Sequence, residues 1–342
     1  MKKFSSYVDK KVYSANEKIA NLQNKTKELF FKCLNNGEDE EYFKRELDKI
    51  WDKVDYSFMQ KDIEEYIEMI HTYNLEQANV KEEDLEGQVD NTNPNKTIYL
   101  MALGLILTQV DRFKEYTNWF YELSYNSPAY KEDKKKYLKL KVQKYNSQTV
   151  PYYSKTKKRL LFFRKPVRHV KLSTYTAMVE NTNLTRSAWN TTLNDADLLG
   201  NDKFYIPFHL FSCEHCREYQ GRILTREEVE THLGIDEEQE GDILHPNCKC
   251  SLLMYWGGNV RINPNYSNEE LEEQYNIRQK VNALTLKKSE LLTDRRIYRD
   301  LNEQDEIDRV NSKIRSINTK IKDLQAQLPT EEMRKEVVAI NR

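Results

Sequence analysis

Two short runs of the sequence gather thiols and a histidine that could bind a metal ion. They are SCEHCREYQG and ILHPNCKC, and together they hold four of the five cysteines in the chain. The candidate ligands are Cys213, Cys216, His245 and Cys248, with Cys250 in reserve. Two thiolates separated by two residues can bind one zinc ion from a tight turn, and His-x-x-Cys offers a nitrogen and a sulfur at the same spacing. The pattern predicts a structural zinc site, which can contribute roughly 10–16 kcal/mol to folding.

Other interpretations of the same residues stay open. No apolar run follows the basic start of the chain, so no secretory signal is predicted and a disulfide is disfavoured. Cys248 and Cys250 would face the same side of a strand and could be packed in the core without a metal. A catalytic thiol would need a base and an orienting partner, and no such pattern accompanies His215 or His245. A His-Asn-His nuclease would need a histidine pair between the runs, where only His232 stands.

A second candidate site is the basic segment from Lys131 to Lys171. It carries fifteen Lys or Arg residues against two acidic ones, with aromatic residues interspersed. Such a segment can bind a nucleic-acid backbone or an acidic protein surface, although a solvated helix face followed by a basic loop has the same composition. The candidate contact residues are Lys134, Lys135, Lys136, Lys157, Lys158, Arg159, Arg164, Lys165 and Arg168.

The composition predicts long polar helices with thin cores rather than one large globule. Charged residues make up 32% of the 342 residues, and the mean hydropathy is -0.86. Nine glycines and eight prolines are few for an all-β protein with many tight turns. The net charge of -1 gives no overall attraction to nucleic acid.

The most apolar stretch, TIYLMALGLILTQV at residues 97–110, is too short to cross a membrane. It has 14 residues, whereas a transmembrane helix needs about 20. The stretch is therefore predicted to be a buried helix, and no membrane span is predicted. Lone Cys33 stands on an apolar helical background and is predicted to lie in the core.

The N-terminal half of the chain is predicted to be helical. Apolar residues recur at helical spacing through residues 1–90, and a second helical block is predicted from 97 to 145. The polar stretch 84–96, which contains Gly, Asn and Pro, is predicted to be a loop. The sequence NSPAY at 126–130 is predicted to interrupt the second block.

The middle of the chain mixes helix and strand. Residues 172–199 predict an amphipathic helix with Gly200 as its C-cap. Thr225 and Glu228 form a capping-box pattern at the start of a small helix. Short strands are predicted near residues 203–211, 222–224 and 249–256.

The C-terminal part predicts a helical hairpin. Apolar residues recur at spacings of four and three, as in a coiled-coil seam, at Val310, Ile314, Ile317, Ile321, Leu324 and Leu328. A weaker series begins at Ile277, so two antiparallel helices could pair and turn near residues 298–306. One long helix that binds a partner is the alternative.

The quoted runs, together with the polar helix LSTYTAMVENTNLTRSAWNTTL, resemble a known family. They are similar to the core of phage minor capsid proteins, in the minor capsid protein 2 and Mu-F-like head morphogenesis families, over roughly residues 165–262. Tyr219-Gln220-Gly221 and His245-Pro246-Asn247-Cys248 match the family pattern well. Glu180-Asn181-Thr182-Asn183 stands where Arg-Thr-Glu-Thr is usual, Lys249 replaces the usual Arg, and Glu214 replaces the usual Pro.

The resemblance implies an α+β fold class that is mostly α-helical. We expect a helical N-terminal region at 1–160, a small α+β Mu-F-like core with the Cys/His turns at 161–262, and a coiled-coil-like helical hairpin at 263–342.

The resemblance also implies a function. We expect a minor structural protein of a tailed-phage head that is not an enzyme. It would lie in the virion, in the capsid interior or at the portal vertex, after synthesis in the host cytoplasm. The expected partners are portal and capsid proteins and packaged double-stranded DNA, with roles in head morphogenesis and in DNA packaging or ejection; self-association is a further expectation. The alternatives are a metal-dependent nuclease or toxin-type enzyme, and a nucleic-acid-binding protein.

Overall fold

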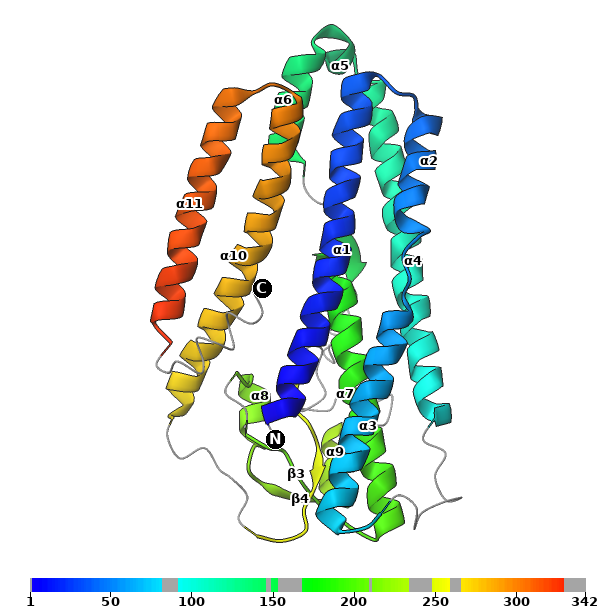
Figure 1. The fold of residues 1–342 in the computed structure, drawn as a ribbon, viewed down its shortest axis with the longest axis vertical. Coiled ribbons are helices and arrows are strands. Elements are labelled where there is room, and N and C mark those ends of the chain that lie inside the picture. Colours follow the sequence, from blue (N-terminus) through cyan, green and yellow to red (C-terminus); the bar gives the residue numbers. More distant parts are fainter. Residues whose placement is uncertain are drawn as a thin grey trace, which may run out of the picture.

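Long helices dominate the molecule and run close to its longest axis (Figure 1). The computed structural model describes residues 2–81, 92–145, 149–152, 168–208, 211–233, 248–258 and 266–328. Two small antiparallel sheets accompany the helices, one of two strands and one of three. The predicted fold class, mostly α-helical with a small α+β part, is confirmed.

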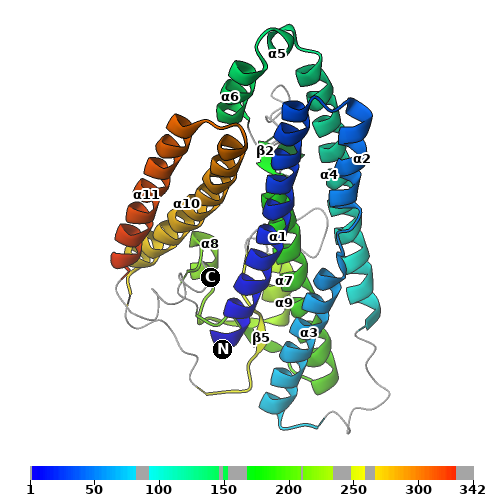
Figure 2. The same ribbon diagram turned by 45° about the horizontal axis from the view of Figure 1, so that its top comes forward.

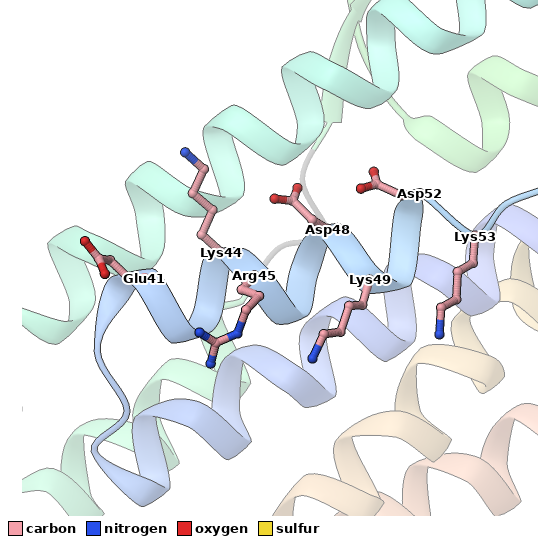
Figure 3. Close-up of a pocket in the computed structure, with 7 residues that line it drawn as sticks. All are labelled: Glu41, Lys44, Arg45, Asp48, Lys49, Asp52 and Lys53. Carbon is pink, nitrogen blue, oxygen red and sulfur yellow. The ribbon is translucent and has the colours of Figure 1, made fainter.

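The first three helices are α1 (Lys2–Asn36), α2 (Glu40–Trp51) and α3 (Ser57–Ala78). Asp39 is the N-cap of α2, and its carboxylate accepts a hydrogen bond from the backbone N–H of Tyr42 at 2.8 Å. Charged side chains are spread along α2 (Figure 3). Cys33 on α1 is buried in the apolar core, as predicted.

The second helical block consists of α4 (Thr92–Tyr125), α5 (Pro128–Glu132) and α6 (Lys134–Lys144). The predicted interruption falls at Asn126 and Ser127. The loop predicted over 84–96 is wrong for its last five residues, because α4 begins at Thr92; residues 84–91 lie outside the described part. Pro94 falls in the first turn, where a missing N–H removes no helical hydrogen bond.

The apolar stretch at 97–110 lies in α4 but is only half buried, so the prediction of a buried helix is wrong. Ala102 and Ile106 face the core, whereas Met101 and Leu105 are 67% and 53% exposed. The reason is that α4 packs on α2, α3 and α7, which cover one side of it. No helix in the described ranges combines the length and the apolar character that crossing a membrane requires.

Helix α7 (Leu172–Leu199) lies at the centre of the bundle and packs against α1, α3 and α4. Its bounds match the predicted helix, and Gly200 ends it with a φ of 66°, in the left-handed region that favours glycine. Two strands that precede it, β1 (Thr149–Tyr152) and β2 (Arg168–Lys171), pair antiparallel.

The three-stranded sheet lies at one end of the bundle (Figures 1 and 2). Its strands, in the order β4–β3–β5, are β4 (Ile223–Thr225), β3 (Lys203–Tyr205) and β5 (Leu253–Met254). Phe204 pairs with Leu224 on one side and with Met254 on the other. Strands β3 and β5 are shorter than predicted, whereas β4 has the predicted length and begins one residue later. Two short helices accompany the sheet, α8 (Glu214–Arg217) and α9 (Arg226–Leu233), and α9 begins with the predicted reciprocal hydrogen bonds between Thr225 and Glu228.

The C-terminal hairpin consists of α10 (Asn268–Asp300) and α11 (Gln304–Ala326). A turn at 301–303 joins them, so the antiparallel pairing is confirmed and the single long helix is wrong. Val310 and Ile314 of the predicted seam are buried in the main core, and Leu328 is buried in a smaller cluster with Phe211 and Val281.

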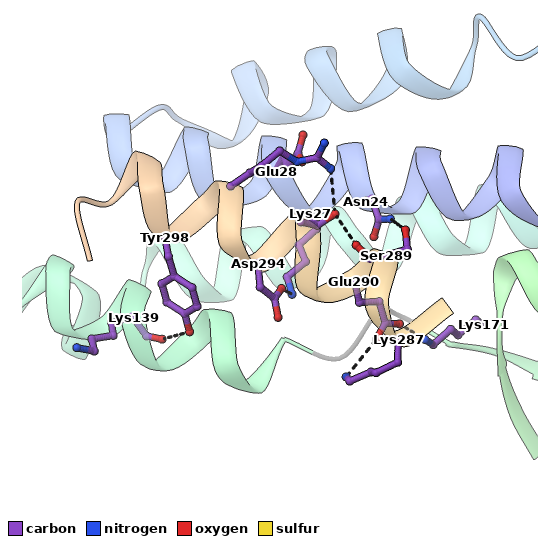
Figure 4. A network of polar contacts seen from close by, with 12 residues as sticks. Asn24, Lys27, Glu28, Lys139, Lys171, Lys287, Ser289, Glu290, Asp294 and Tyr298 are labelled. Atoms are coloured by element: carbon purple, nitrogen blue, oxygen red, sulfur yellow. Dashed lines mark hydrogen bonds and ion pairs between the residues drawn. The ribbon is translucent and has the colours of Figure 1, made fainter. Parts of the chain in front are cut away.

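The hairpin is bonded to α1 through side chains (Figure 4). Lys27 on α1 donates to Asp294 at 2.5 Å, and Asn24 donates to Ser289 at 3.2 Å. One hydrophobic cluster contains Phe4, Leu184 and Val310, so the three expected regions share a core. Their division at 160 and 262 stays a prediction.

Candidate functional site

Three buried cysteines form a cluster at the end of the bundle that carries the small sheet. Cys216 lies on α8, and Cys248 and Cys250 lie in the segment 248–252, which leads into β5. Their sulfur atoms all lie within 4.8 Å of one another, and those of Cys216 and Cys248 are 3.5 Å apart. None of the three forms a disulfide. We call these three residues the thiol cluster.

The spacing of the sulfur atoms suits one tetrahedral metal ion. Zinc–sulfur bonds of about 2.3 Å place the ligand sulfurs of a tetrahedral site roughly 3.8 Å apart. In the thiol form, hydrogen bonding among Cys213, Cys216, Cys248 and Cys250 and burial raise the pKa of Cys216. A bound zinc ion would reverse that preference, because thiols that coordinate it are deprotonated.

The structure brings together three of the five predicted ligands. This combination differs from the four that were predicted first, which were Cys213, Cys216, His245 and Cys248. Cys250, which was held in reserve, belongs to the thiol cluster. Cys213 is the N-cap residue of α8 and is half-buried; its thiol hydrogen-bonds with Cys216 but stands outside the cluster. His245 lies outside the described residues.

Helix α7 holds the segment 248–252 through its backbone carbonyls. Asn181 and Thr185 both donate to the carbonyl of Cys248, at 2.6 Å and 3.1 Å. The indole Nε1 of Trp189 donates to the carbonyl of Cys250 at 2.7 Å, and Thr192 donates to the carbonyl of Leu252 at 2.9 Å. We call these four donors of α7 the polar ladder.

The polar ladder follows from the geometry of a helix beside an extended chain. One helical turn advances about 5.4 Å, and two residues of extended chain advance about 6.6 Å. Donors about one turn apart on α7 can therefore reach every second carbonyl, which is the spacing from Cys248 to Cys250 to Leu252. A buried carbonyl without a partner costs about 1–3 kcal/mol, so these bonds favour one register of the segment.

The intervening side chains of the segment contact α1 and α3. Lys249 donates to Asp9 on α1, which also accepts from Arg278 on α10. Burial would raise the pKa of the Asp9 carboxyl, but the two cations outweigh burial and lower its pKa to about 2. Ser251 shares a hydrogen bond of 3.0 Å with the hydroxyl of Tyr66 on α3. The cysteine segment is thus fixed by three helices and α8.

Helix α7 is buried on nearly all sides, although one buried face was predicted. Small polar side chains make this possible, because their hydroxyls can bond within the helix. Thr176 and Thr191 each donate to the carbonyl four residues earlier, at 3.0 Å. Asp195 is fully buried near the C-terminal end of α7, where its oxygens lie 2.7 Å from His71 Nδ1 and 2.8 Å from Asn74 Nδ2. Sequence analysis missed this contact, since His71 and Asp195 are far apart in the chain.

Glu180 is a buried acidic residue near the middle of α7. Its side chain is fully buried, and neither carboxylate oxygen has a hydrogen-bond partner among the described residues. Burial, followed by the nearby charge of Asp62, raises its pKa to about 8. Glu180 is therefore protonated in the folded protein at neutral pH.

An open hollow of about 620 Å³ lies along α2. Figure 3 shows Asp48 and Asp52 on one side of the helix, and Lys49 and Lys53 on the other. Lys114 on α4 bonds to both aspartates, at 2.7 Å and 2.9 Å. These charges form surface ion pairs and do not converge on a point where a substrate could bind.

The lysines of α6 differ in their contacts. Lys134 donates to the carbonyl of Asn35 at 2.9 Å, and Lys135 lies 3.1 Å from Glu303 in the turn of the hairpin. Lys136 is exposed and has no ion-pair partner in the described part of the chain. Arg168 lies on β2. Lys157, Lys158, Arg159, Arg164 and Lys165 lie outside the described residues.

Comparison with known proteins gives one match. The family model of phage minor capsid protein 2 matches residues 148–329, just over half of the chain. No curated protein and no solved structure gives a significant match. The matched range begins next to β1, ends next to Leu328, and contains the polar ladder, the thiol cluster and the hairpin. The resemblance found in the sequence is thereby confirmed and reaches further toward the C-terminus, and the chain belongs to the phage minor capsid protein 2 family.

Proposed function

We propose that this structural protein of the phage head associates with the portal, and that its thiol cluster is a closed structural zinc site. Family membership supports a structural role in the head. The observation that carries the zinc proposal is the placement of three buried sulfur donors within 4.8 Å of one another.

Burial favours a structural metal over a catalytic one. Catalytic zinc sites keep one position open for water or substrate, whereas structural sites are closed by four protein ligands. Cys216, Cys248 and Cys250 are at most 2% exposed. In addition, the polar ladder donates hydrogen bonds to the backbone carbonyls of Cys248 and Cys250. The proposed role therefore requires no catalysis by this chain.

Cys213 is the fourth ligand in this proposal. Two residues separate it from Cys216, which is the spacing of a zinc knuckle, and its thiol already hydrogen-bonds with that of Cys216. Cys213→Ser should weaken zinc binding, and His245→Ala should leave it unchanged. The reverse result would assign the fourth position to His245 instead.

Portal association is proposed to use the basic segment. Lys136 on α6 supports it, because its exposed charge is not used by an ion pair within the described part of the chain. An acidic portal surface or packaged double-stranded DNA would each fit a basic segment, and phosphate contacts make DNA affinity fall steeply with salt.

The test combines charge reversal with two binding assays. Lys136→Glu, Lys157→Glu and Lys158→Glu together should weaken co-purification with the portal protein or binding to double-stranded DNA by about tenfold or more, with the salt dependence separating the two partners. Lys44→Glu on α2, also exposed, is the matched control. Unchanged binding to both partners in the triple variant contradicts the proposed role of the segment.

A further inference from the structure

A groove of about 550 Å³ runs between the two helices of the C-terminal hairpin, and we call it the hairpin groove. Apolar side chains from both helices line it, with Leu291 on α10 and with Val310 and Ile317 on α11. Four cations also line it, and they are Lys287, Arg309, Lys313 and Lys320. The groove therefore suits a ligand that carries apolar and anionic groups together.

The cations of α11 lie in one line along the hairpin groove. Arg309, Lys313 and Lys320 are separated by 4 and 7 residues, so they share one face of the helix over about three turns, or about 16 Å. All three are exposed. Arg309 lies 3.7 Å from Glu306, whereas Lys313 and Lys320 have no ion-pair partner in the described part of the chain. A ligand with two or more negative charges could therefore pair with this line.

The carboxylates in and beside the hairpin groove are bonded by lysines that do not line it. Figure 4 shows Asp294 beside Lys27 of α1, which donates to it at 2.5 Å. Glu306 lies 3.7 Å from Lys139 of α6. Glu290, next to the groove on α10, is shared between Lys287 and Lys171 of β2. These carboxylates are thus already compensated, and the groove keeps an excess of positive charge.

Helix α6 shows how the hairpin pairs with a further helix. It packs against α10 near the turn of the hairpin (Figure 2). Lys139 of α6 donates to Glu303 at 2.9 Å, and the hydroxyl of Tyr298, which lines the groove, lies 3.5 Å from the carbonyl of Lys139. A basic helix therefore meets the end of the hairpin where the first turn of α11 is acidic. From Arg309 to Lys320 every charged residue of α11 is basic, so the same matching calls for an acidic helix there.

We infer that the hairpin groove binds an amphipathic helix of another protein, which presents Asp or Glu side chains to the cations of α11 and apolar side chains to Leu291 and Ile317. Helices with one apolar face bind in this way to grooves between other helices. Double-stranded DNA is also anionic, but its phosphate backbone has no apolar side chains to place on Leu291 and Ile317. The groove contains no residue of the thiol cluster or of the basic segment, so the inference is independent of the function proposed above.

The first experiment measures binding of two labelled peptides to the full chain by fluorescence anisotropy. Each peptide is a synthetic amphipathic helix of about 21 residues with leucine along one face; one carries glutamate on the flanks of that face, and the other carries lysine. The glutamate peptide should bind about tenfold more tightly or better, and Lys313→Glu/Lys320→Glu should reverse the preference. Arg315→Glu/Lys322→Glu is the matched control, because these exposed cations of α11 have the same separation but do not line the groove.

The control variant should keep the preference for the glutamate peptide. Three results overturn the inference: no binding of the glutamate peptide, equal binding of the two peptides, or equal weakening by the two double variants.

The second experiment locates the binding site without a change of charge. Ser316→Trp fills the hairpin groove at an exposed position and should weaken binding of the glutamate peptide about tenfold or more. Ser312→Trp, also exposed on α11 but outside the groove, should leave binding unchanged. A short double-stranded DNA is the competitor and should not displace the peptide. Displacement by DNA would assign the groove to nucleic acid and overturn the inference, as would peptide binding that Ser316→Trp leaves unchanged.

Discussion

The indole nitrogen of Trp189, on the central helix, donates a hydrogen bond to the backbone carbonyl of Cys250 at 2.7 Å. Both residues are buried, and Cys250 belongs to the thiol cluster. The bond joins the polar helix to the cysteine segment, the two sequence features that resemble the family. Together with Asn181, Thr185 and Thr192, it explains why a helix at the centre of the bundle carries polar side chains: they supply donors to the buried carbonyls of this segment.

Trp189→Phe tests the polar ladder. The variant keeps an aromatic ring in the core but removes the donor, so the carbonyl of Cys250 loses its partner. We expect the free energy of unfolding in urea to fall by about 1–3 kcal/mol. Trp256→Phe, at a tryptophan that is 43% exposed, should change it by less than about 0.5 kcal/mol. Equal effects of the two variants would show that the hydrogen bond contributes nothing.

Glu180→Gln tests the buried carboxyl through its dependence on pH. In the folded protein the pKa of Glu180 is raised from 4.5 to about 8. Between these values the unfolded chain releases its proton and the folded protein keeps it, so unfolding becomes easier as pH rises. The slope is about 1.4 kcal/mol per pH unit, and it vanishes below the unfolded pKa and above the folded one.

Glutamine is neutral at every pH and removes this slope. We therefore expect the difference in unfolding free energy between Glu180→Gln and the unchanged chain to shift in favour of the variant by a few kcal/mol between pH 5 and pH 8. The measurement is urea unfolding at both pH values, with the exposed Glu218→Gln as the control. A stability difference that is the same at pH 5 and pH 8 would contradict the raised pKa.

Asp9→Asn tests the opposite case, a carboxylate whose pKa is lowered. The variant leaves Lys249 and the buried Arg278 without their shared anion, and breaking a buried ion pair in this way costs about 3–5 kcal/mol. Because the folded pKa is about 2, below the ordinary 3.8, this stabilisation is fully present above pH 4 and is lost as pH falls toward 2.

Thermal or urea unfolding at pH 7 and at pH 2.5 measures the effect of Asp9→Asn, with the exposed Asp305→Asn as the control. The gap between Asp9→Asn and the unchanged chain should narrow at the lower pH. A gap that stays constant, or a variant as stable as the control at pH 7, would show that the pair does not hold the cysteine segment to α1.

Local signals predicted the elements well. The bounds of α7, its end at Gly200, the capping box of Thr225 and Glu228, and the turn of the C-terminal hairpin all depend on residues close in sequence. The polar ladder and the contact between His71 and Asp195 could not be predicted in the same way, because a single sequence does not indicate which distant donor meets which carbonyl or carboxylate. The choice of Cys250 over Cys213 for the thiol cluster likewise depends on how the segment 248–252 is turned by α7.

The prediction for residues 97–110 failed for a related reason. Apolar character indicates that a face will be covered, but not by what. Within the described part of the chain, Met101 and Leu105 stay largely exposed.

The most direct test of the structural account is the zinc content of the purified chain, measured by elemental analysis together with its folding. We predict one zinc ion per chain. The variant Cys248→Ser should contain no zinc and should show no cooperative unfolding transition. The variant Cys33→Ser should retain the zinc, because the thiol of Cys33 lies in the core away from the thiol cluster. A chain that contains no zinc when purified without chelators, and that unfolds at the same urea concentration with and without added zinc, would contradict the account.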